Sequence, residues 1–219
     1  MNLAPYIDHT NLKPEAAAED IKKLCEEALR CGFASVCVNS SRAALAAELL
    51  KGSSVAVCAV VGFPLGAASS AAKAFEAKKA AEDGASEIDM VINIGFIKDG
   101  TDEEAAKDIR AVVDAAPGCI VKVIIETCLL TKEEKIRACH AAMAAGAHFV
   151  KTSTGFSTAG ATEEDVRLMR ETVGTAMKVK AAGGISTVED METFLALGAD
   201  RLGTSRAVKI LNGEQAKGY

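Results

Sequence analysis

The sequence lacks the features that mark secreted, membrane-spanning or nucleic-acid-binding proteins. No apolar run reaches the length needed to cross a bilayer, and the first residues have neither a basic start nor the apolar segment of a signal peptide. The formal net charge of −5 is small and negative, which argues against nucleic acid or an anionic membrane as the main partner. We therefore expect a cytoplasmic protein that binds neither nucleic acid nor a membrane.

Residues that form disulfides or bind metals are also few or scattered. The seven cysteines are odd in number and include no Cys-x-x-Cys pair, which indicates free thiols in a reducing compartment. Cys37 is the one thiol that falls at a predicted strand end. Of the three histidines, His140 falls in a predicted helix and His148 at a strand start. A catalytic metal needs several converging ligands, so we expect none.

No linker, low-complexity stretch or 20-to-50-residue repeat divides the 219 residues. Residues 1–219 are therefore predicted to form a single domain with a sizeable core. Short apolar segments alternate with helical patterns along its whole length. The predicted strands are 6–8, 33–38, 55–61, 87–92, 120–125, 149–151, 177–180 and 200–202. Helices are predicted to start at Pro14, Ser40 or Ser41, Ser69 or Ser70, Thr101, Thr131, Thr162, Ser186 or Thr187, and after Ser205.

This alternation of eight strands and eight helices predicts an α/β protein with a closed parallel sheet, a (β/α)8 TIM barrel. The main alternative is an open, doubly wound sheet. That alternative is disfavoured because no Gly-x-Gly-x-x-Gly follows the first strand. In a (β/α)8 barrel the active site lies at the carboxyl ends of the strands. The polar residues at or near these ends are Asp8, Asn39, Asp89, Asn93, Glu126, Lys151, Lys180 and Ser205.

Lys151 is the most informative of these residues. It ends an apolar run that starts at Ala147, and three hydroxyl residues and Gly155 follow it at once. A lysine is costly to bury unless it has a task, and a buried amine is more readily neutral and nucleophilic, as Schiff-base chemistry requires. A lysine that simply extends from the strand end to solvent is the simpler alternative.

Other charged residues alternate along the predicted strands. Lys122 and Glu126 share one face of their strand, and Lys178 shares a face with Lys180. Charges on the inner face of a barrel must pair or react. For Lys122, Lys178 and Glu126 we favour a structural ion-pair network.

Glycine-rich turns follow the last three predicted strands. They contain Gly155, then Gly183 and Gly184, then Gly203 with Ser205, and Arg206 adds a positive charge. Phosphate sites in this fold lie after the seventh and eighth strands, and glycine lets backbone N–H groups approach an anion closely. We predict that these residues bind a phosphate group.

Motifs spread over nearly the whole chain resemble those of the deoxyribose-phosphate aldolase family. They are Asp8-His9-Thr10, Val36-Cys37-Val38-Asn39, Val61-Gly62-Phe63-Pro64-Leu65-Gly66, Glu87-Ile88-Asp89-Met90-Val91, Lys122-Val123-Ile124-Ile125-Glu126-Thr127, Val150-Lys151-Thr152-Ser153-Thr154-Gly155, Lys180-Ala181-Ala182-Gly183-Gly184 and Gly203-Thr204-Ser205. The departures are Asn11, where leucine is usual, Ser40, where proline is common, and Phe156, where some members have a lysine. Phe156 would give a phosphate no charge.

The resemblance implies a class I aldolase that reversibly cleaves 2-deoxy-D-ribose 5-phosphate to acetaldehyde and D-glyceraldehyde 3-phosphate without a cofactor. Lys151 would form the imine, and the positive charge of Lys180 would favour its neutral amine. Asp89 would hold Lys180 and relay protons through water. Tyr219 would reach into the site from the end of the chain. We also expect a homo-oligomer, either a dimer or a tetramer.

Two other functions remain open on the sequence alone. One is a different class I aldolase or lyase with another pair of aldehydes. The other is a barrel that binds sugar phosphates without catalysis, although binding alone would not require two lysines and an acid at the strand ends.

Overall fold

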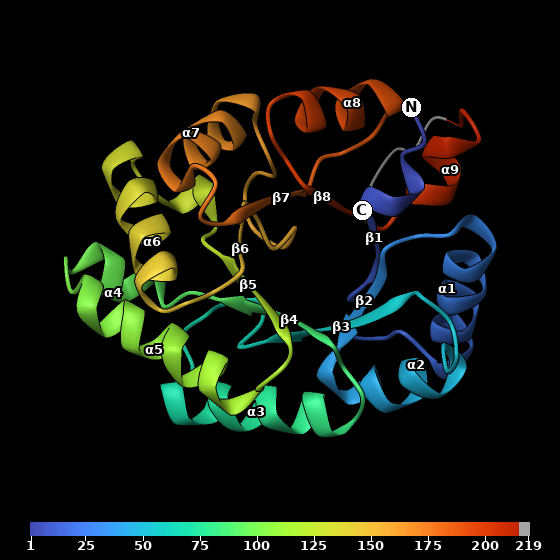
Figure 1. Ribbon diagram of the computed structural model, residues 1–219, viewed down its shortest axis with the longest axis horizontal. Coiled ribbons are helices and arrows are strands. Elements are labelled where there is room, and N and C mark those ends of the chain that lie inside the picture. Colours follow the sequence, from blue (N-terminus) through green and yellow to red (C-terminus); the bar gives the residue numbers. More distant parts are fainter. Residues whose placement is uncertain (215–219) are drawn as a thin grey trace.

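The computed structural model describes residues 1–214, which form a closed barrel of eight parallel strands surrounded by helices (Figure 1). Each strand pairs with its neighbours in sequence order, and the last strand closes on the first. The strands are β1 (Ile7–Asn11), β2 (Ser35–Asn39), β3 (Ala56–Val61), β4 (Glu87–Val91), β5 (Ile120–Ile124), β6 (Phe149–Lys151), β7 (Lys178–Ala182) and β8 (Arg201–Thr204). The predicted (β/α)8 barrel is confirmed.

The helices form the outer ring around the barrel (Figure 1). They are α1 (Ala18–Cys31), α2 (Ala43–Leu49), α3 (Ser70–Glu82), α4 (Ile94–Lys98), α5 (Asp102–Ala115), α6 (Lys132–Ala144), α7 (Glu163–Val173), α8 (Val188–Ala196) and α9 (Ala207–Leu211). Three short 3-10 helices are η1 (Ala4–Tyr6), η2 (Ser40–Arg42) and η3 (Thr127–Leu129). No helix within residues 1–214 is both long and apolar enough to cross a membrane.

Several helix starts follow the capping residues in the sequence. The Thr131 hydroxyl accepts the N–H of Glu134, and the Glu134 carboxylate accepts the N–H of Thr131, as in the predicted capping box of α6. The side-chain oxygens of Ser69, Thr162 and Thr187 likewise accept an N–H from the first turn of α3, α7 and α8, and Thr187 forms a capping box with Asp190.

Two helix predictions were wrong. The first helix starts at Ala18 rather than Pro14, because the Asp20 carboxylate accepts the N–H of Ala17 at 2.8 Å and fixes the first turn there. The second predicted start, at Ser40 or Ser41, is occupied by η2, and α2 begins only at Ala43. In addition, α4 was not predicted, since five residues are too few to show a helical repeat of apolar residues.

The apolar core has two parts. The larger part lies between the barrel and the helices, and it includes the buried face of α1 formed by Ile21, Leu24, Cys25 and Ala28. The smaller part is a separate cluster of Leu12, Cys37, Cys58 and Val60, with Phe63 packed against it. Cys58 also contacts the charged residues of the barrel interior, so the small cluster borders the polar site described next.

A buried ion pair supports the carboxyl end of β4 from outside the barrel. Lys73 of α3 lies 2.7 Å from Asp108 of α5, and its ammonium also donates to the Val91 carbonyl at 2.9 Å. Both side chains are fully buried, and burial lowers the pKa of Lys73 while Asp108 opposes that shift. The pair therefore anchors the end of the strand that carries Asp89.

Candidate active site

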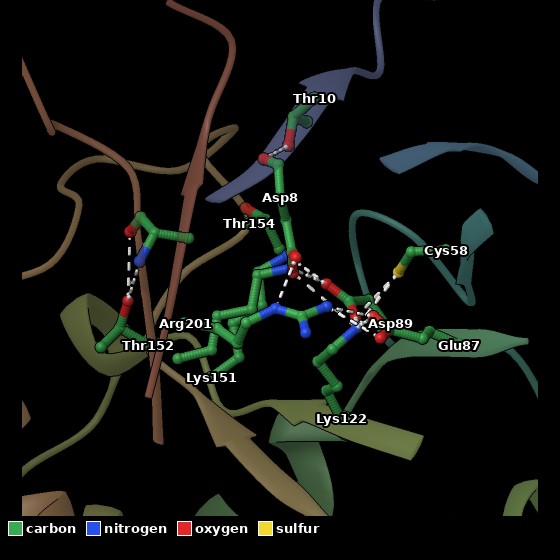
Figure 2. Close-up of polar contacts among 12 residues, drawn as sticks. Asp8, Thr10, Cys58, Glu87, Asp89, Lys122, Lys151, Thr152, Thr154 and Arg201 are labelled. Carbon is green, nitrogen blue, oxygen red and sulfur yellow. Dashed lines mark hydrogen bonds and ion pairs between the residues drawn. The ribbon is translucent and has the colours of Figure 1, made fainter. Parts of the chain in front are cut away.

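Lys151 ends β6 and is almost completely buried, at 3% exposure. Its Nζ donates to Oδ2 of Asp89 on β4 at 2.8 Å (Figure 2). The alternative that Lys151 merely extends to solvent is therefore excluded. The amine is held in place by a carboxylate and lines a pocket at the carboxyl ends of the strands.

Lys180 lies directly opposite Lys151 in the β6–β7 register and is fully buried. Its Nζ is 2.7 Å from Oδ2 of Asp89 and 2.5 Å from Oδ2 of Asp8. Burial alone would lower the pKa of Lys180, but the carboxylates of Asp8 and Asp89 outweigh burial and raise it. Lys180 is therefore a fixed positive charge beside Lys151.

Asp89 is the centre of the site. Its Oδ2 accepts from Lys151 and Lys180, and its Oδ1 accepts from Lys122 at 2.7 Å and from the Cys58 thiol at 3.1 Å. Burial would raise the pKa of Asp89, but the three lysines hold it well below its usual range. Asp89 is thus an ionised carboxylate in contact with three lysine side chains.

A second layer of charges lies behind these three residues. Arg201 of β8 bridges Asp8 and Glu87, with Nε 2.8 Å from Asp8 and one terminal nitrogen 2.8 Å from Glu87 (Figure 2). Lys122 is 2.6 Å from Glu87, so the predicted ion-pair network around Lys122 is confirmed. Ser35 also donates to Asp8 at 2.7 Å.

Sequence reasoning did not assign Glu87 and Arg201 to the site. The two-residue period of a strand contained the signal, because Glu87 precedes Asp89 by two positions and Arg201 precedes Gly203 by two. Both side chains therefore share the inward face with a predicted site residue.

Two members of the predicted ion-pair network lie elsewhere. Lys178 is exposed at the start of β7, where its Nζ lies 5.6 Å from the ring centroid of Phe149. Glu126 is buried, but it accepts hydrogen bonds from the N–H and hydroxyl of Thr154 at 3.2 and 2.5 Å. Because β5 ends at Ile124 and the backbone of Glu126 is left-handed, the strand alternation does not extend to this residue.

Other strand-end residues have structural contacts. Asn39 donates to the Leu12 carbonyl at 3.3 Å, and Asn93 caps α4. Cys37 and Cys58 are paired in register on β2 and β3 and are fully buried. A hydrogen bond from Cys58 lowers the pKa of Cys37, whereas burial raises that of Cys58.

The predicted phosphate-binding residues and Lys151 line one pocket. Its walls include Gly155, Gly183, Gly184, Gly203, Ser205 and Arg206, together with Thr10, Leu12, Thr154, Ala182, Ile185 and Thr204. Gly183 and Gly184 have φ angles of +83° and +79°, which suit glycine. At Gly160 the loop after β6 lies directly against the turn after β7. Glycine allows this approach, because any side chain there would collide with the Gly183 carbonyl.

Within residues 1–214, the candidate metal ligands that converge are Cys37, Cys58 and Asp89, whose ligand atoms lie within 4.8 Å of one another. This set is poorly suited to a cation, because Lys122, Lys151 and Lys180 already contact Asp89. Tyr219, the remaining predicted site residue, lies outside the described residues.

A model of the DeoC/LacD family aldolases matches residues 3–206 of the sequence. The chain belongs to this aldolase family. It is 59% identical over 216 residues to the deoxyribose-phosphate aldolase of Geobacillus sp. (strain WCH70), covering 98% of this chain and 97% of the relative. It is also 60% identical over 213 residues to the deoxyribose-phosphate aldolase of Clostridium perfringens (strain 13 / Type A), covering 97% and 95%.

A solved structure gives the same result for this DeoC/LacD family aldolase. The deoxyribose phosphate aldolase from Aeropyrum pernix, described as a unique tetrameric structure, superposes with a TM-score of 0.90 at 34% identity. The match covers 96% of this chain and 90% of that one. The similarity therefore extends over the whole barrel and includes every strand that carries the site.

Proposed function

We propose that this DeoC/LacD family aldolase reversibly cleaves 2-deoxy-D-ribose 5-phosphate to acetaldehyde and D-glyceraldehyde 3-phosphate. The observation that carries the proposal is the buried amine of Lys151, which contacts ionised Asp89 and opens onto a pocket lined by three glycine turns. The names of the similar proteins support the same substrate. Lys151 is the nucleophile in this proposal, and the chemistry needs no cofactor.

Cleavage proceeds through a covalent intermediate. The Lys151 amine adds to the C1 aldehyde of the open-chain sugar, and loss of water leaves a protonated imine. The C3 hydroxyl loses its proton and the C2–C3 bond breaks. C3 becomes the aldehyde of D-glyceraldehyde 3-phosphate, which leaves, and the electron pair of the broken bond flows into the imine to form an enamine. Protonation of C2 and hydrolysis then release acetaldehyde and the free amine.

Proton transfer is assigned to the pair formed by Lys180 and Asp89. The Lys180 ammonium and the Lys151 amine contact the same Asp89 oxygen, so a proton can pass between them directly or through one water. Tyr219 is proposed as a further proton donor to the enamine carbon. Support for Tyr219 comes from the sequence resemblance alone.

The phosphate group is assigned to the far end of the same pocket. Backbone N–H groups at Gly155, Gly183, Gly184 and Gly203 can approach its oxygens, and Ser205 and Arg206 add a hydroxyl and a positive charge. Lys151 lines the same pocket, which allows one open-chain sugar phosphate to contact both regions.

Imine trapping tests the proposal. Acetaldehyde and borohydride should convert Lys151 to its N-ethyl derivative and abolish activity, and peptide mass spectrometry locates the modified residue. Lys180 provides the internal control, because it lies in the same site. An ethyl group on Lys180 with unmodified Lys151 would contradict the assignment. Release of acetaldehyde from deoxyribose 5-phosphate separates this function from another aldolase and from a binding protein.

We further propose a cytoplasmic homo-oligomer, a dimer or a tetramer. The relationship to the tetrameric Aeropyrum pernix enzyme supports an assembly. Light scattering coupled to size-exclusion chromatography measures the mass directly, and a mass equal to one chain of 22.7 kDa would contradict this proposal.

A further inference from the structure

We infer that Arg201 and Glu87 are positioning residues that set the pH at which the Lys151 amine becomes nucleophilic. They do so through the charge balance of the buried ion-pair network. Neither residue lines the pocket that contains Lys151. The inference rests on the proposed role of Lys151, and it assigns a catalytic effect to two residues that do not touch substrate.

The charges of the network can be counted from its ion pairs. Three carboxylates, Asp8, Glu87 and Asp89, are joined to four cationic groups, Lys122, Lys151, Lys180 and Arg201. With Lys151 neutral, three negative charges face three positive charges. With Lys151 protonated, one positive charge is left without a matching negative charge in a buried network, which is costly.

The carboxylates of the network favour the protonated form of its other cations. Burial would lower the pKa values of Lys122 and Lys180, but the surrounding carboxylates raise both. Asp8 and Glu87 raise the pKa of Arg201 in the same way. Burial would raise the pKa of Asp8, but Lys180, Lys122 and Arg201 lower it. Lys122, Lys180 and Arg201 therefore supply three positive charges, and Asp8, Glu87 and Asp89 three negative charges, around the amine of Lys151.

Two chains of contacts connect the second layer to Lys151. Arg201 contacts Asp8, which contacts Lys180, and Lys180 shares an oxygen of Asp89 with Lys151. Glu87 contacts Lys122, which binds the other oxygen of Asp89. Both chains end on Asp89, so a charge lost in the second layer acts on the carboxylate that holds Lys151.

The remaining polar and ionisable groups around Lys151 come from several elements. Glu126 takes its hydrogen bonds from Thr154, and the thiols of Cys37 and Cys58 are buried on β2 and β3. Arg206 lines the far wall of the pocket and donates to the Ile185 carbonyl. The variants described below leave all of these groups in place.

The test compares two substitutions with opposite effects on charge. Arg201→Met removes a positive charge, which should favour protonated Lys151 and move the pH of half-maximal imine trapping upward. Glu87→Gln removes a negative charge and should move it downward. Each shift should be about one pH unit, the size expected for one charge at roughly 10 Å with an effective dielectric constant of about 20.

The measurement is the initial rate of Lys151 ethylation by acetaldehyde and cyanoborohydride as a function of pH. Two further variants serve as matched controls. Arg201→Lys keeps the charge and should leave the midpoint unchanged. The double variant Glu87→Gln/Arg201→Met restores the charge count and should return the midpoint to that of the wild type.

The outcomes separate this inference from the proposed function. Suppose that wild-type Lys151 is ethylated but that Glu87→Gln and Arg201→Met shift the midpoint in the same direction or not at all. The inference about Arg201 and Glu87 is then wrong, while the assignment of Lys151 as the nucleophile is retained. If wild-type Lys151 is not ethylated at any pH, the proposed function itself fails. If circular dichroism shows that Arg201→Met does not fold, Glu87→Gln alone tests the inference. The pH midpoint of Lys151 ethylation must then be lower in Glu87→Gln than in the wild type, and an unchanged or higher midpoint contradicts the inference.

Discussion

Lys151 and Lys180 lie directly opposite each other on neighbouring parallel strands, and their amines contact the same oxygen of Asp89, at 2.8 and 2.7 Å. The two lysines differ in their other partners. Lys180 also pairs with Asp8, which helps to raise its pKa, whereas Lys151 lines the pocket. This asymmetry supports the proposal that Lys180 supplies a positive charge and that Lys151 is the nucleophile.

Lys180→Leu should lower the turnover number by several powers of ten, because it removes both the fixed charge and a proton carrier beside Lys151. Lys178→Leu is the matched control two positions earlier on β7. Its side chain is exposed and packs over Phe149, so its turnover should stay close to that of the wild type. Steady-state kinetics on folded variants provides the comparison. Equal losses of turnover in both would contradict the roles assigned here.

Arg206→Ala should raise KM for deoxyribose 5-phosphate by roughly 10- to 150-fold, because a charge-assisted hydrogen bond contributes about 1.5–3 kcal/mol. KM for unphosphorylated deoxyribose should change little. Lys209→Ala, an exposed cation on the following helix, is the control and should affect neither substrate. A similar rise for both sugars would show that Arg206 does not bind the phosphate.

Deletion of Tyr219 should slow both cleavage and the exchange of acetaldehyde methyl protons with deuterium, because a phenol can carry the proton to and from the enamine carbon. Imine trapping at Lys151 should remain. Proton NMR in deuterium oxide measures the exchange rate. Tyr6→Phe, at the other tyrosine, is the control, and full activity of the truncated chain would remove Tyr219 from the mechanism.

Lys73→Met should lower the free energy of unfolding by about 3–5 kcal/mol, since it leaves Asp108 buried without its cation. The double variant Lys73→Met/Asp108→Leu should recover most of this loss. Lys78→Met, exposed on the same helix, is the control and should cost little. The single variant Asp108→Leu completes the double-mutant cycle, and urea unfolding measures all five proteins. Strictly additive losses would show that the two residues are not coupled.

Asp8→Asn should destabilise the protein most at neutral pH. The pKa of Asp8 in the folded protein lies below its usual value of 3.8, so the carboxylate stabilises the fold at pH values above 3.8. That contribution is lost as the pH falls below this value. The difference in the free energy of unfolding between wild type and Asp8→Asn should therefore be constant above about pH 5 and shrink below about pH 4.

The exposed substitution Asp114→Asn is the control for this pH dependence. The free energy of unfolding of Asp114→Asn should differ little from that of the wild type at every pH. A difference for Asp8→Asn that does not change with pH would show that packing, and not charge, accounts for the loss.

Much of the barrel could be predicted from the sequence, because its strands are short apolar runs separated by residues that cap helices. Lys151, Lys180 and Asp89 could be placed at strand ends for the same reason. The start of α1 could not be predicted well, since Pro14 is a common first helical residue and the competing hydrogen bond to Asp20 depends on local geometry.

The second layer of charges was harder to predict. Strand alternation places Arg201, the first residue of β8, on the inward face, but it does not identify the partners of this side chain. Those partners are Asp8 and Glu87, which come from the first and fourth strands. Contacts between residues so far apart in the sequence follow from closure of the barrel and cannot be read from any local pattern.

The ion pair between Asp8 and Arg201 joins residues that are 193 positions apart. During synthesis on a ribosome, the nascent chain carries Lys151 and Lys180 well before β8 emerges. Until Arg201 arrives, the charge network is incomplete and the barrel is open between its first and last strands. A newly made chain therefore completes the charge network around Lys151 only as its final strand docks, and an incomplete chain released before β8 would lack Arg201.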